Sequence, residues 1–63
     1  MGRMTDFEPN NHVRIDDPLD THYECEGIVK AFNVKTGDYM IEMVTGDAKG
    51  DTLKYSSTDL KLN

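Results

Sequence analysis

Hydrophobic residues in this chain occur in short alternating runs, and no stretch of ten residues repeats with the period of a helix. Alternation of apolar and polar residues is typical of a strand that buries one face. The runs are separated by glycine, proline, asparagine and aspartate, the residues that favour turns. The pattern therefore predicts an all-β fold made of short strands.

Five segments fit the strand pattern: residues 12–16, 23–33, 39–44, 52–55 and 60–62. In the third segment we expect Tyr39, Ile41 and Met43 to face the core, which leaves Met40 and Val44 outside. In the second segment the alternation slips at Glu26-Gly27. A glycine at such a slip indicates a bulge or a sharp bend, which lets one long strand serve two sides of a barrel.

The segments between the predicted strands contain recognisable turns. Residues 35–38 read as a hairpin turn in which Gly37 takes a positive φ. Residues 45–51, with two glycines and three charges, read as an open loop. Residues 56–60 read as a single turn in which Ser or Thr hydroxyls accept hydrogen bonds from free N–H groups.

The chain is long enough for one domain. Residues 1–11 are polar and end in Pro9-Asn10-Asn11, which indicates a flexible arm, and residues 12–63 form the predicted five-stranded barrel. A domain of this size buries only about 60% of the surface of its unfolded chain, so its core is thin. The single cysteine cannot form an internal disulfide, and nothing indicates an oxidising compartment.

The charge of the chain restricts its partners. Twelve acidic and seven basic side chains give a net charge of −5, which repels a phosphate backbone and makes nucleic acid an unfavourable partner. The longest uncharged apolar stretch is two or three residues, so we expect neither a signal peptide nor a membrane span. The expected location is cytoplasmic, or peripheral on a complex at the cytoplasmic side.

Two groups of side chains resemble metal ligands. His12, His22 and Cys25 provide three ligands where a structural zinc site needs four from tightly spaced pairs, so we predict no metal there. Two aspartate clusters, Asp16, Asp17, Asp20 and Asp47, Asp51, could offer oxygen ligands to calcium, but neither has the order of an EF-hand loop. We interpret these aspartates as turn caps, with calcium binding as the alternative.

Catalytic motifs are missing from the sequence. No glycine-framed elbow surrounds Ser56 and Ser57, and no phosphate-binding glycine loop is present. A single chain of this size also lacks the depth for a substrate pocket, although a site between subunits stays open as an alternative. We therefore predict a protein that is not an enzyme and that binds no cofactor and no small-molecule substrate.

The order of these segments resembles a known family. Residues 13–23, then Gly27-Ile28-Val29, then residues 53–60 resemble the SH3-like barrels of small accessory proteins. Within that group the chain is most similar to the small S subunit of the photosynthetic NADH dehydrogenase-like complex, a ferredoxin-docking barrel. The resemblance implies an SH3-like fold and a docking role in a redox complex. An acidic partner such as ferredoxin requires a locally basic face, for which Arg14, Lys30, Lys35 and Lys54 are candidates.

The sequence leaves two classes of function. The first is a non-catalytic protein–protein interaction module, an accessory or docking subunit of a larger complex. Its predicted partner-binding residues are Arg14, Tyr23, Lys30, Phe32, Met40, Val44 and Lys54. The alternative is a small acidic effector, of phage or mobile-element origin, that inhibits a nucleic-acid-binding protein of its host by occupying the basic site. An apolar docking surface predicts modest sensitivity to salt, and an acidic mimic predicts a steep one.

Overall fold

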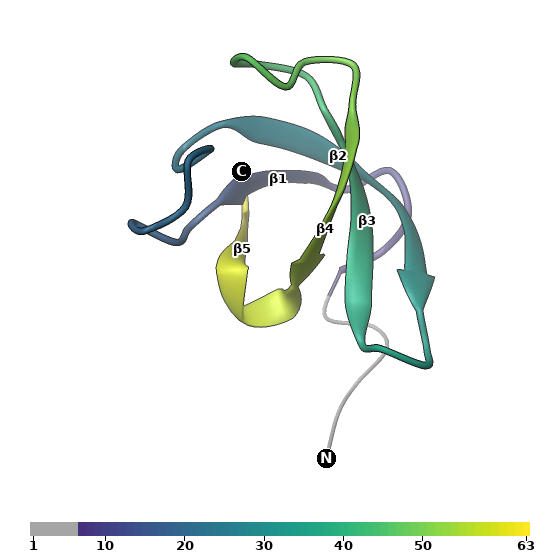
Figure 1. Cartoon of the computed structure of the whole chain (residues 1–63). Coiled ribbons are helices and arrows are strands. Elements are labelled where there is room, and N and C mark those ends of the chain that lie inside the picture. The colour runs from purple at the N-terminus through teal and green to yellow at the C-terminus, as the bar shows by residue number, and fades with distance from the viewer. Residues whose placement is uncertain (1–6) are drawn as a thin grey trace.

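The computed structural model describes residues 7–63, which form one antiparallel sheet of five strands (Figure 1). The strands are β1 (His12–Ile15), β2 (Glu26–Asn33), β3 (Asp38–Met43), β4 (Thr52–Ser56) and β5 (Leu60–Leu62). A 3-10 turn, η1 (Ser57–Asp59), joins β4 to β5, and the described residues hold no α-helix. The predicted all-β fold is confirmed.

The strand order across the sheet is β4-β3-β2-β1-β5. Strands that follow one another in the chain are neighbours, except that β5 returns to pair with β1. The two sheet edges are therefore β4 and β5, and η1 carries the chain from one edge to the other. Figure 1 shows that β2 curves strongly between β1 and β3, so that the sheet bends around its core.

The core lies on the concave side of the bent sheet. Tyr39, Ile41 and Met43 of β3 are at most 1% exposed, as the alternation predicted. Val13, Ile15 and Val29 from β1 and β2 are equally buried, and Tyr55 and Leu60 extend the core to the two edge strands. Burial of each large apolar side chain contributes about 1.5–3 kcal/mol, so this small set holds the sheet together.

The irregularity in β2 does not lie where the sequence predicted it. The register shifts between Val29 and Ala31, and Gly27 lies in the regular ladder opposite Val13 and Met43. A methyl group on Gly27 would stand 2.9 Å from the carbonyl oxygen of Glu42 and would overlap the side chain of Ile41. The glycine therefore serves close packing of β2 on β3, and the predicted bulge at Glu26-Gly27 is wrong.

β2 also begins later than the sequence predicted, at Glu26 and not at Tyr23. Residues 21–24 form a turn, and Glu24 takes a φ of 70°, which an extended strand cannot contain. Asp17 Oδ1 accepts a hydrogen bond from the N–H of Leu19 at 3.0 Å, and Asp20 Oδ1 accepts one from His22 at 2.7 Å. The interpretation as turn caps is confirmed for Asp17 and Asp20, because their carboxylates hold the backbone of the loop, and it stays a prediction for Asp16, Asp47 and Asp51.

The hairpin turn before β3 and the single turn before β5 have the predicted positions. Gly37 has a φ of 79° in the hairpin between β2 and β3. η1 is the predicted single turn, but its capping differs from the prediction, because no side chain bonds the free N–H groups at its start. Ser56 Oγ donates to Asp59 Oδ2 at 3.2 Å and lies 2.9 Å from Thr58 Oγ1, so these side chains bond one another.

Part of the predicted arm, residues 7–11, lies against the sheet. The N–H of Asn10 donates to the carbonyl of Val29 at 2.7 Å, and Val29 donates to the carbonyl of Asn11 at 2.9 Å. The ring of Phe7 meets Tyr39 edge-on, with 5.4 Å between centroids. Residues 7–11 therefore continue the pairing of β2 beyond β1, whereas residues 1–6 of the predicted arm lie outside the described part of the chain.

Candidate docking surface

Five of the seven predicted partner-binding residues lie on the convex side of the sheet, which we call the outer face. These residues are Arg14, Lys30, Met40, Val44 and Lys54. They come together because side chains alternate along each strand, so that positions between core residues face outward. The register then places Met40 beside Lys54 of β4 and Ala31 of β2.

Three apolar side chains of the outer face lie around Glu42. Ile28 of β2 lies opposite Glu42 of β3. Met40 lies two residues before Glu42 and Val44 two residues after it, so both face the same side. All three apolar side chains are half-buried. Ile28 was not among the predicted partner-binding residues, although its place between Gly27 and Val29, which face inward, was a signal for an outward apolar position.

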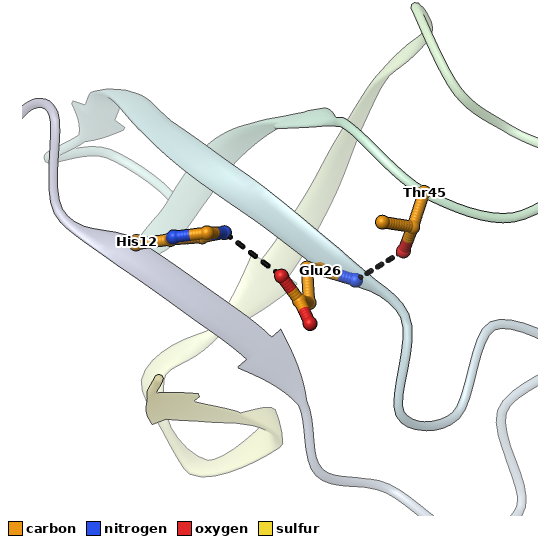
Figure 2. A network of polar contacts seen from close by, with 3 residues as sticks. All are labelled: His12, Glu26 and Thr45. Atoms are coloured by element: carbon orange, nitrogen blue, oxygen red, sulfur yellow. Dashed lines mark hydrogen bonds and ion pairs between the residues drawn. The ribbon is translucent and has the colours of Figure 1, made fainter.

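One ion pair, and one histidine–glutamate contact that is an ion pair only when the histidine is protonated, lie among these apolar side chains. Lys30 Nζ is 3.4 Å from Glu42 Oε1, and His12 Nε2 is 3.0 Å from Glu26 Oε1. Figure 2 shows His12 and Glu26 reaching toward each other from β1 and β2, while the N–H of Glu26 donates to Thr45 Oγ1 at 2.8 Å. Exposed pairs of this kind contribute only about 0–1 kcal/mol, so they shape the polarity of the surface more than the stability of the fold.

Charge is distributed unevenly between the outer face and the rest of the chain. By register and alternation, the outer face holds four cations, Arg14, Lys30, Lys54 and Lys61, and three carboxylates, Glu26, Asp38 and Glu42. The face is therefore +1 in a chain of net charge −5, which leaves −6 for the other residues. Among residues 7–63, no carboxylate oxygen lies within 4.0 Å of the Arg14, Lys54 or Lys61 side-chain nitrogens.

The remaining two predicted residues lie elsewhere. Phe32 follows the register shift in β2 and packs on the core side, with its ring centroid 4.7 Å from that of Tyr39. Tyr23 is 41% exposed in the turn before β2, in the same loop as Leu19, which is 94% exposed. Neither side chain therefore lies on the outer face beside Met40.

One polar contact links the loop of residues 16–25 to the edge of the sheet. The hydroxyl of Tyr55 in β4 donates to Asp20 Oδ1 at 3.1 Å. Burial of the phenol, together with this hydrogen bond and the carboxylate charge, raises the pKa of Tyr55 to about 12. The phenol therefore stays protonated at neutral pH and holds the loop in place.

The possible metal ligands do not gather into a site. In the part of the chain that the structure describes, no three side chains of His, Cys, Asp or Glu lie in a position to hold one ion. His12 instead pairs with Glu26, and Cys25 is half-buried against the core. A methyl group on Gly46 would stand 2.6 Å from the sulfur of Cys25, so this thiol fills the junction between the loops of residues 16–25 and 44–51.

No protein-family model matches this chain, and no curated protein matches it either. Within residues 7–63, no helix has the length and apolar character needed to cross a bilayer.

Proposed function

We propose that this chain is a non-catalytic protein–protein interaction module, an accessory or docking subunit of a larger complex. The observation that carries the proposal is the group of three half-buried apolar side chains around Glu42 on the outer face, Ile28, Met40 and Val44. Stable protein interfaces combine an apolar centre with a polar rim that fixes orientation. We assign Arg14 and Lys54 to such a rim, since no carboxylate oxygen of residues 7–63 lies within 4.0 Å of their side-chain nitrogens.

We further propose that the fold is a small SH3-like barrel. Three features support this: the strong bend of the sheet along β2, the five-strand order, and the single turn that links the two edge strands. The resemblance to the ferredoxin-docking S subunit then favours a redox complex as the partner, at a cytoplasmic location or on the cytoplasmic side of a membrane complex. The local excess of cations on the outer face suits an acidic partner.

A second candidate function is the acidic effector that occupies a basic nucleic-acid site of a host protein. It is favoured by the two loops of residues 16–25 and 44–51, which meet where Cys25 faces Gly46. The loops contain six carboxylates and one lysine. A surface of this composition attracts a basic protein through long-range charge, and such attraction is weakened strongly by salt.

The two candidates are separated by capture from the native host's lysate at low and at raised salt. The double variant Met40→Ser with Val44→Ser removes apolar surface from the outer face, and Val34→Ser is the matched control, because Val34 is 69% exposed in the hairpin turn. The docking proposal expects one partner that the wild-type protein and the control retain at raised salt and that the double variant loses.

Capture that salt abolishes and that the double variant retains would favour the acidic effector. Equal capture by all three proteins at raised salt would contradict the proposed docking surface.

A further inference from the structure

The margin of the sheet at β4 has an unpaired backbone. β4 pairs with β3 on one side only, and no backbone hydrogen bond of the described residues reaches its other side. Figure 1 shows β4 beside β3, leading into η1. A free strand edge presents a row of N–H and C=O groups that can pair with another extended chain. The opposite edge, β5, offers only three residues.

The side chains of β4 determine what can pair there. Thr52, Lys54 and Ser56 face outward, whereas Leu53 and Tyr55 face the core. Leu53 is only half-buried, so an added strand could cover its remaining surface. Lys54 is exposed, lies at the middle of the strand and has no carboxylate within 4.0 Å among residues 7–63.

A second copy of this chain is an unfavourable occupant of the edge. Two β4 strands paired antiparallel about their middle residue would place Lys54 opposite Lys54, and like charges directly opposite each other destabilise a strand pair. Two chains of net charge −5 also repel each other. A carboxylate opposite Lys54 makes the same pairing favourable.

We infer that the β4 edge binds an extended segment of the partner protein as a sixth strand, with a carboxylate facing Lys54 and apolar side chains alternating with it toward Leu53. The main-chain hydrogen bonds of the added strand provide affinity, and Lys54 favours the pairing register that places a carboxylate opposite it. The inference rests on the proposed function in taking a protein as the partner. The inference adds where and how the partner binds: by strand pairing at β4, whose Lys54 lies beside Met40 of the outer face.

The test uses the whole chain and a synthetic probe, the capped peptide Val-Thr-Val-Glu-Val-Thr-Val, followed by amide NMR. We expect saturable shifts at the amides of Leu53, Lys54 and Tyr55. Methylation of alternate peptide nitrogens, which removes the donors of one edge, should weaken binding at least about tenfold. A peptide with Lys in place of Glu should bind wild type about fivefold more weakly, and Lys54→Glu should reverse that preference.

Any of three outcomes would overturn the inference. One is the absence of shifts in β4 at a peptide concentration of about 1 mM, a range in which weak strand pairing is measurable. The others are equal binding by the methylated peptide, and shifts centred on Ile28 and Val44 with none in β4. The capture experiment with Met40→Ser and Val44→Ser does not depend on the peptide, so failure of the edge and failure of the docking surface are distinguishable.

Discussion

Tyr55 connects the loop before β2 to the edge of the sheet, and its ionisation should therefore affect stability. The pKa of Tyr55 is about 12 in the folded chain, above the ordinary value of 10.0. A raised pKa means that the stabilisation is complete below pH 10 and is lost as pH rises through 12. We expect the free energy of unfolding to fall across this window by up to about 2–3 kcal/mol from Tyr55 alone.

Tyr55→Phe should flatten that alkaline fall and should lower stability at neutral pH by about 0.5–1.5 kcal/mol, because the hydrogen bond to Asp20 is lost. The measurement is urea unfolding at several pH values. Tyr23→Phe is the matched control, since Tyr23 is 41% exposed. An equal change in the alkaline curve for both variants would contradict the role of Tyr55.

Single residues explain why parts of the local structure could not be predicted. The alternation predicts a bulge or a sharp bend at Gly27, but the register is regular there, and the glycine leaves room for Ile41 and Glu42, which come 14 and 15 residues later. Glu24 has a positive φ that no property of glutamate favours. Such positions depend on tertiary contacts, which alternation along one strand does not contain.

At the level of elements, residues 7–11 act as a short extension of the sheet that covers the aromatic end of the core. Phe7 meets the ring of Tyr39 edge-on, and the N–H of Phe7 donates to the Tyr39 hydroxyl at 3.2 Å. Phe7→Ala should lower the free energy of unfolding by about 1–2 kcal/mol, less than for a fully buried phenylalanine because Phe7 is half-buried. Chemical denaturation measures this loss.

The same variant should speed hydrogen exchange at the amide of Val29, which donates to Asn11. Glu8→Ala, at an exposed neighbour, serves as the control and should leave both quantities unchanged. Stability equal to wild type in Phe7→Ala would show that residues 7–11 do not contribute to the core.

The strands themselves were predictable, because one buried face imposes a period of two on each of them. The alternation around Tyr39, Ile41 and Met43 gave the correct inner face of β3, and with it the outward positions of Met40 and Val44. The predicted outward position is wrong for Phe32, whereas Tyr23 is exposed as predicted. The register shift after Val29 turns Phe32 to the core side, and Tyr23, which begins the predicted strand, lies in a turn before β2.

At the scale of the whole molecule, the net charge of −5 means that carboxylates outnumber cations, with 12 acidic against seven basic side chains. Residues 7–63 contain one Lys–Glu ion pair and one His–Glu contact that is an ion pair only when the histidine is protonated, all between partly exposed side chains. Repulsion among the carboxylates therefore exceeds the attraction within pairs, and it opposes the compact state at neutral pH. Salt screens exposed charges that are separated by more than the Debye length, about 10 Å at 0.1 M, and should relieve this repulsion.

We therefore expect sodium chloride to raise the Tm at pH 7 by about 2–4 °C, which corresponds to about 0.5 kcal/mol for a domain of this size. At a pH near the isoelectric point of 4.7, the net charge vanishes and the same addition should leave the Tm unchanged or lower it. Calorimetry at the two pH values measures the difference. A Tm that falls with salt at pH 7 would mean that attraction between the outer-face cations and the surrounding carboxylates outweighs the repulsion. The cations would then already be satisfied within the chain, which would remove the electrostatic support for an acidic partner.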